Sequence, residues 1–268
     1  MSADIKTLRN RIKSVDSTLH LTKAMGLVAS SKIRRAQENM KKSREYKNAF
    51  GDVIASLCAS PECKDSPFLK KAEGGKEKII IIAGDRGLAG GYNANVFRLA
   101  REFEDAEFIP IGKRACDRFG GELHLAETFS ALDALKLSEK LCQEFENGEF
   151  SHLGIIGTKY VSMMTQEAQI KWILPLSAEE GSKKSASVLF EPDEMTILKA
   201  VISEYVAGAI FAEVRESFAS EVAARRCAMD SAGKNAQQMI DDLQLSYNRA
   251  RQGAITQELT EIVAGSNA

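Results

Sequence analysis

The first candidate for chemistry is a glycine-rich segment, which runs from Gly84 to Asn93 and reads G-D-R-G-L-A-G-G-Y-N. It follows the apolar run Lys78–Ala83 and precedes a helical pattern, which is where a phosphate-binding loop would lie. Its spacing fits neither G-x-x-x-x-G-K-[ST] nor G-x-G-x-x-G, and no clear acidic residue follows in a ribose-binding position. We therefore favour a tight turn with a partner-contacting face, in which Asp85 pairs with Arg86. Nucleotide binding stays open as an alternative.

The other reactive side chains do not form a catalytic or metal-binding pattern. Five cysteines in a chain of this size favour reduced thiols and a cytosolic compartment over a disulfide framework. Cys58 and Cys63 have four residues between them and lack a second pair, which is a poor zinc pattern. The sequence has no H-E-x-x-H or G-x-S-x-G motif, and adjacent carboxylates such as Asp241 and Asp242 are typical of a solvated helix face. We expect no catalytic residue, no metal and no cofactor.

Composition places the chain among soluble globular proteins. It has 268 residues, of which 44% are hydrophobic and 27% charged, and this excludes a disordered or collagen-like chain. No run approaches ~18 consecutive apolar residues, so we expect no membrane span. The N-terminal segment lacks the apolar core of a secretory signal, and its continuation into a regular helix argues against a transit peptide.

The charges are unevenly distributed although the net charge is only −1. Residues 1–50 carry twelve Lys and Arg against four Asp and Glu, whereas residues 193–268 carry seven against eleven. Opposite charges would let the two ends of the chain attract one another. Alternatively, the basic segment binds nucleic acid or another acidic surface, although only Tyr46 and Phe50 are aromatic within it.

The N-terminal part predicts one long helix that packs on another helix. A seven-residue apolar repeat runs without a break from Ile5 to Leu57, and twelve of its sixteen positions are apolar or alanine. A helix over residues 3–57 would be about 80 Å long, which is too long to fold back on a compact domain. We assign residues 1–60 to an N-terminal coiled-coil helix.

The C-terminal part predicts a second, longer helix over residues 192–268. Pro192 and Asp193 suit a helix start, and no proline follows. A break or bend in this helix is possible at two places, Gly208 and the polar stretch 230–238. A continuous helix would be about 105 Å long, so antiparallel pairing would leave its end without a partner in the chain.

Residues 75–191 predict a central Rossmann-like α/β domain. Short apolar runs alternate with helical patterns, which indicates βαβ units and a sheet with helices on its faces. The expected strands are 78–83, 108–111, 153–160, 169–174 and 187–190, and the expected helices are 95–104, 113–119 and 131–146. The predicted fold class is therefore α/β, with a long antiparallel coiled coil of the N- and C-terminal helices and this domain between them.

Three regions of the sequence closely resemble the γ subunit of F-type ATP synthases of the bacterial type. In the N-terminal helix these are Ile12–Val15, Leu21–Met25 and Val28–Gln37; in the centre the loop Asp85–Asn93; and in the C-terminal helix Ser220–Arg225 and Leu245–Ile262. The resemblance follows the family's order and usual length. The chain departs from many relatives at Ala89, where they carry cysteine.

The resemblance implies a central rotor shaft that couples ion-driven rotation of the membrane c ring to ATP synthesis or hydrolysis in the α/β hexamer. Such a subunit is not itself catalytic and holds no cofactor. Its implied partners are the α and β subunits, the ε subunit and the c ring, with no nucleic acid. Its implied location is peripheral, on the cytoplasmic face of the inner membrane. The rival reading is a nucleotide-binding α/β enzyme with helical arms, and a third is a coiled-coil nucleic-acid binder.

The resemblance also implies two sets of partner-contact residues. Those facing the α/β hexamer are Lys23, Met25, Arg86, Gly87, Ala89, Arg225, Arg251, Gln252 and Thr256. Those facing ε and the c ring are Val188, Leu189, Phe190 and Glu191.

Overall fold

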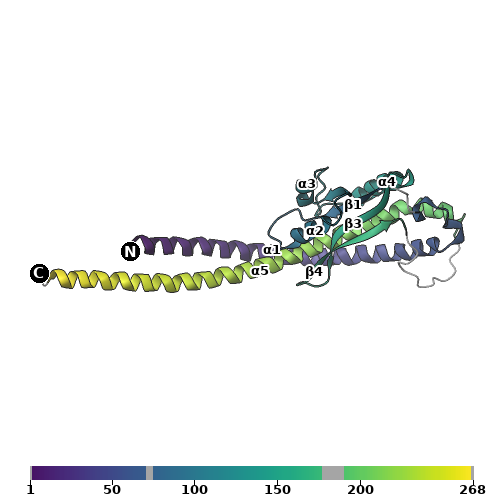
Figure 1. Ribbon diagram of the computed structural model, residues 1–268. Helices are drawn as coiled ribbons and strands as arrows, with labels where there is room; N and C mark the ends of the chain where they lie inside the picture. The colour runs from purple at the N-terminus through teal and green to yellow at the C-terminus, as the bar shows by residue number, and fades with distance from the viewer. Residues whose placement is uncertain (1, 71–74, 177–189, 267–268) are drawn as a thin grey trace. The chain divides into compact units, whose positions relative to one another are not determined.

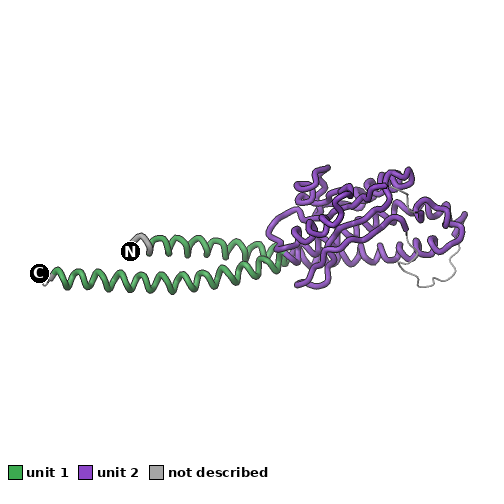
Figure 2. The backbone as a smooth tube through the Cα atoms, viewed as in Figure 1, with its two compact units in different colours: residues 1–30, 225–268 green, residues 31–224 purple. Residues whose placement is uncertain are grey.

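A computed structural model describes residues 2–70, 75–176 and 190–266 (Figure 1). Two compact units make up the chain, and Figure 2 colours them separately. Unit 1 contains residues 1–30 and 225–268, and unit 2 contains residues 31–224. The predicted strand 187–190, except for its last residue, and the predicted contact residues Val188 and Leu189 lie outside the described residues.

Both predicted long helices are confirmed. Helix α1 spans Ser2–Cys58 and α5 spans Glu194–Ser266. Asp193 caps the start of α5, because its carboxylate accepts hydrogen bonds of 2.8 Å from both the backbone N–H and the hydroxyl of Thr196. These bonds lower the pKa of Asp193. Helix α5 continues through Gly208 and through residues 230–238, so the open question of a break there is settled in favour of one helix.

Unit 1 is an antiparallel helix pair. Val15 and Leu19 of α1 pack against Ala236 and Ile240 of α5. About two turns further along α1, the backbone oxygen of Gly26 accepts a hydrogen bond of 3.4 Å from the Arg226 guanidinium. Residue numbers thus rise along one helix as they fall along its partner, and Figure 2 shows the two segments side by side. This is the pairing that the heptad pattern predicted.

The far end of α5 is exposed among the described residues of unit 1. Ile5 and Arg9 near the start of α1 still share a surface hollow with Tyr247 and Ala254. From residue 255 to residue 265 every side chain of α5 is exposed. Four of them are large and apolar, namely Ile255, Leu259, Ile262 and Val263. The end of α5 is therefore exposed over residues 255–265, as the difference in length between the two helices predicted.

Within the described residues, unit 2 is built on a four-stranded mixed sheet in the order β2-β1-β3-β4. Its strands are β1 (Lys76–Ile82), β2 (Glu107–Ile111), β3 (Phe150–Tyr160) and β4 (Gln166–Leu174). Strand β1 pairs parallel with β2 and β3, whereas β4 pairs antiparallel with β3. Strand β2 lies at an edge, as its proline predicted.

Helices cover both faces of this sheet, which is why β1 is apolar at every position from Ile79 to Ile82. Ile79 and Ile81 face a cluster with α2 (Tyr92–Ala100) and α3 (Lys113–Phe119). Ile80 and Ile82 face a larger cluster with α4 (Ala131–Glu146), α5 and two short 3-10 turns, Pro61–Cys63 and Pro67–Leu69. The predicted α/β class with helices on the sheet faces is confirmed.

One helix is long and apolar enough by composition to span a membrane. An 18-residue window within Glu194–Gly265 has a mean hydropathy of 1.5, and 39% of that window is buried. The core helix of a soluble protein passes the same test. Ile202, Val206 and Ile210 of α5 pack in the larger core cluster, so packing in unit 2 accounts for its apolar face.

Gly112, between β2 and α3, provides a test of this packing. Its φ is +94°, and a Cβ there would lie 1.9 Å from the backbone oxygen of Ala83. Gly120 also has a positive φ, +77°, but open space around it. We expect Gly112→Ala to lower the free energy of unfolding by about 3 kcal/mol or more and Gly120→Ala by only ~1–2 kcal/mol. Urea denaturation of the two variants measures this difference. Equal losses of unfolding free energy would contradict the close approach of Gly112 to the backbone of Ala83.

Candidate functional site

The usual ligand site of an α/β sheet is filled by α5 in this chain. Such sheets bind ligands at the carboxyl ends of their parallel strands, where the strand order reverses. Here Gly84 follows β1 and Gly157 lies towards the end of β3. A Cβ at Gly84 would lie 2.7 Å from the Glu221 carboxylate, and one at Gly157 would lie 2.9 Å from the Ser217 hydroxyl. Because these two glycines have no side chain, α5 can pack at the position where another protein of this class would bind a ligand.

Helix α5 is fixed at this position by a buried polar stripe, which we term the α5 seam. It consists of Glu213, Glu216, Ser217 and Ser220, and all four are buried. Their spacing of three, four and seven residues places them on one face of the helix. Each has partners on α1 or on the sheet, so the stripe joins three elements of unit 2.

Glu213 is the central member of the α5 seam. It is 2% exposed, and its Oε1 lies 3.2 Å from Lys47 Nζ of α1 and 2.6 Å from Lys171 Nζ of β4. A buried carboxylate requires compensation by charge and hydrogen bonds, and two ammonium groups supply it here. The carboxylate thus holds the helix and the sheet edge together.

The remaining members continue the attachment along the end of β3. Glu216 accepts hydrogen bonds of 2.9 Å from Arg44 and 3.1 Å from the Tyr160 N–H. The Ser217 hydroxyl accepts from the Thr158 N–H at 3.0 Å, and the Ser220 hydroxyl donates to the Thr158 oxygen at 3.1 Å. The backbone groups of Thr158 and Tyr160, near the end of β3, are therefore hydrogen-bonded to α5.

The glycine-rich loop forms the expected tight turn. Leu88 and Gly90 have positive φ angles of 62° and 58°, and Asn93 accepts a hydrogen bond from the Gly84 N–H at 2.9 Å. The Asp85 carboxylate accepts from the backbone N–H groups of Lys113, Ala126 and Glu127. Because Lys113 begins α3, the carboxylate caps that helix and holds the glycine-rich loop against it. Arg86 lies 3.6 Å from the Glu127 carboxylate, whereas the sequence suggested that it pairs with Asp85.

In unit 1 the expected partner-contact residues differ in exposure. Lys23, Arg251, Gln252 and Thr256 are exposed, whereas Met25 and Arg225 are half-buried. Lys23 lines a surface hollow of about 480 Å³ between the two helices. Beside it, Leu27 is 71% exposed and Leu21 is also exposed. Sequence analysis missed these two leucines, although their apolar character off the heptad positions was a usable signal.

In unit 2 the expected contact residues are only partly at the surface. Arg86 is exposed and Gly87 half-buried, but Ala89 is 3% exposed and offers a partner almost no surface. Leu88 is instead the exposed apolar side chain of this loop. Phe190 packs against the core, and Glu191 is exposed.

The thiols and the acidic groups give no metal centre within the described residues. No group of three or more His, Cys, Asp or Glu side chains there could hold a metal ion. All five cysteines are free thiols. Burial raises the pKa of Cys58 to about 11 and that of Cys142 to about 12, so both remain protonated at neutral pH and react slowly.

Glu213→Gln tests the energetic role of the α5 seam. The substitution leaves Lys47 and Lys171 without their shared counter-charge, while water can still reach both ammonium groups. We expect the free energy of unfolding to fall by about 2 kcal/mol. Glu204→Gln, at an exposed position on the same helix, is the control and should cost less than about 0.5 kcal/mol. Chemical denaturation compares them, and similar losses would show that Glu213 contributes no more than a surface charge.

Comparison with known proteins gives a consistent assignment. A family model described as ATP synthase matches residues 4–268. The chain is 40% identical to the ATP synthase gamma chain of Ruminococcus albus, with 98% of each chain covered. It is 38% identical to the sodium-ion-specific ATP synthase gamma chain of Acetobacterium woodii, covering 100% of this chain and 99% of that one.

Solved structures show the same fold. A chain of the Euglena gracilis mitochondrial ATP synthase rotor superposes with a TM-score of 0.69 at 18% identity, covering 95% of this chain and 100% of that one. A chain of the Tetrahymena thermophila mitochondrial ATP synthase central stalk and c ring gives 0.60 at 17% identity, covering 79% and 99%. The match of the family model and the identity to bacterial relatives over nearly the full length decide the assignment. The chain belongs to the family of ATP synthase γ chains.

Proposed function

We propose that this chain is the central rotor shaft of an F-type ATP synthase. The observation that carries the proposal is the antiparallel helix pair of unit 1, whose longer helix ends in an exposed apolar segment. A single apolar helix end is unfavourable in water unless another protein surrounds it. Enclosure by the α/β hexamer would bury Ile255, Leu259, Ile262 and Val263.

Within this proposal the chain is not catalytic. Helix α5 fills the crevice where an α/β enzyme would bind its substrate. A nucleotide-binding enzyme site at this crevice, which was the rival hypothesis, would therefore lack space for its ligand. The shaft acts instead by contacting the catalytic subunits differently as it turns, so that each contact favours a different conformation of the subunit.

The proposed contacts with the α and β subunits lie on both units. Lys23, Met25, Arg225, Arg251, Gln252 and Thr256 contribute from unit 1, and Arg86 and Gly87 from unit 2. Leu21, Leu27 and Leu88 join this set because they are exposed apolar side chains next to it. Exposed charge pairs would contribute only ~0–1 kcal/mol each, so burial of these leucines would supply more of the binding energy.

The proposed contacts with the ε subunit and the c ring lie at the segment before α5. Glu191 is exposed there, while Phe190 packs inward and supports the segment. Attachment to the c ring would place the chain at the cytoplasmic face of the membrane as a peripheral subunit. The chain would hold no cofactor and would bind no nucleic acid.

Two nested deletions test this function. Removal of residues 255–268 takes away the exposed end of α5, and removal of residues 239–268 also takes away part of the helix pair. We expect both to lower the rate of ATP synthesis by the complex reconstituted in vesicles, the longer one by about tenfold or more, because contacts that distinguish the catalytic subunits are lost.

Hydrogen exchange and co-purification provide the controls. Amide protection in unit 2 should stay unchanged in both deletions, since neither touches residues 31–224, and the shortened chains should still co-purify with the other subunits. Undiminished synthesis by both shortened forms would contradict the role assigned to the end of α5.

A further inference from the structure

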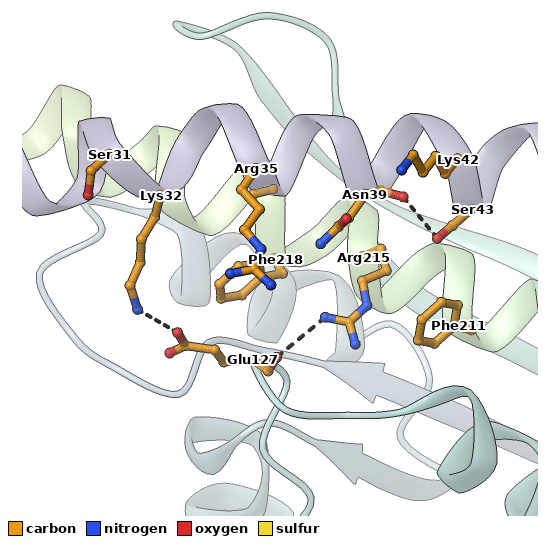
Figure 3. Close-up of a pocket in the computed structure, with 11 residues that line it drawn as sticks. Ser31, Lys32, Arg35, Asn39, Lys42, Ser43, Glu127, Phe211, Arg215 and Phe218 are labelled. Atoms are coloured by element: carbon orange, nitrogen blue, oxygen red, sulfur yellow. Dashed lines mark hydrogen bonds and ion pairs between the residues drawn. The ribbon is translucent and has the colours of Figure 1, made fainter.

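A cavity in unit 2 is left unexplained by the rotor function. It has a volume of about 700 Å³ and lies between α1, α5 and the loop that contains Glu127 (Figure 3). Ser31 to Ser43 of α1 form one wall, and Phe211 to Phe218 of α5 form another. The volume falls in the range of ~300–1,000 Å³ that is typical of small-molecule sites.

The walls carry an excess of positive charge. Four cationic side chains line the cavity against one carboxylate: Lys32, Arg35, Lys42 and Arg215 against Glu127. Lys32 is neutralised, because its Nζ lies 2.5 Å from the Glu127 carboxylate. Arg35 and Lys42 form no hydrogen bond or ion pair with any other residue of the described ranges. Three positive charges therefore lack a negative partner within this part of the chain.

Arg215 is the most constrained of these cations. It is half-buried, and its guanidinium donates to the backbone oxygens of Glu127, at 3.3 Å, and of Phe129. Its Cζ lies 4.7 Å from the centroid of the Phe211 ring. Burial lowers the pKa of Arg215, which shows that water compensates its charge poorly. The carbonyl oxygens and the ring orient the guanidinium but leave its positive charge in place. An anion in the cavity would neutralise that charge.

The spacing of the cations favours a ligand with several anionic groups. Arg35 and Lys42 are seven residues apart on one face of α1, which is about 10 Å along the helix axis. A short chain of phosphates can place a separate anionic group near each cation, whereas a single phosphate would draw both side chains to one point. Arg and Lys are the side chains that bind phosphate best. The Arg215 guanidinium is held in place by its two carbonyl partners and the Phe211 ring. In Figure 3, Arg35 extends from α1 towards Phe218, which offers an apolar surface beside the charges.

We propose that this cavity binds an oligophosphate, an anion with two or more linked phosphate groups. Arg35 and Arg215 contact adjacent phosphates, and Lys42 contacts the end of the chain. The ligand is either a nucleoside triphosphate, whose base would lie against Phe218, or an inorganic oligophosphate. This site is separate from the glycine-rich loop, whose Asp85 caps the N-terminus of α3.

Isothermal titration calorimetry of the full chain tests the chemistry of the ligand. Inorganic triphosphate should bind, orthophosphate should bind about tenfold or more weakly, and added salt should weaken both. Tighter binding of ATP than of triphosphate identifies a nucleotide ligand, and equal binding identifies an inorganic one; both support the proposal. If hexaglutamate binds as tightly as triphosphate, the assignment to phosphate is wrong.

A matched pair of variants tests the location. The double substitution Arg35→Gln with Lys42→Gln removes two cavity cations, whereas Arg34→Gln with Lys41→Gln removes two cations at the same spacing that do not line the cavity. All four side chains are exposed, so both variants should keep the fold. We expect the first to weaken triphosphate binding about tenfold or more and the second less than about twofold. Equal weakening by the two variants would overturn the proposal, as would the absence of binding to the unchanged chain.

Discussion

Buried negative charge on α5 is the constraint on which the arrangement of unit 2 depends. A carboxylate that is 2% exposed cannot lose its cationic partners without a large penalty, and Glu213 has those partners on both α1 and β4. Sliding of either element along α5 would separate the charges. The apolar core alone would permit such sliding at lower cost, because hydrophobic contact is not directional. The α5 seam therefore gives unit 2 a definite register, which a part that transmits torque requires.

Unit 1 differs from unit 2, because several of its large apolar side chains are exposed and would be buried by a partner. Its helices pack through side chains such as Leu19 and Ile240, while other large apolar side chains such as Leu27 and Leu259 face outward. In an isolated protein this distribution would favour aggregation. In a γ chain it is consistent with a helix pair that is enclosed by partners, and the family assignment gives the distribution a purpose.

The elements that could be predicted from the sequence are those whose apolar residues recur with a regular period. The heptads of α1, the apolar run of β1, and the patterns of α3 and α4 each bury one or two faces, so their spacing identified them almost to the residue. The α5 seam was not foreseen, because a Glu on a long helix is usually solvated and no spacing reveals that Lys47 and Lys171 will reach it. The burial of Ala89 and the partners of Asp85 depend in the same way on how the loop folds onto α3, which the local sequence does not encode.

The central claim is that this chain turns as one shaft inside its complex, and single-molecule rotation tests it most directly. A bead attached to the exposed surface of unit 2, through a cysteine at Glu102 in an otherwise cysteine-free chain, would report the motion in the assembled complex. During ATP hydrolysis the account predicts continuous rotation in one direction that stops when ATP is removed. A bead that stays in place while the complex hydrolyses ATP at its full rate would contradict the account.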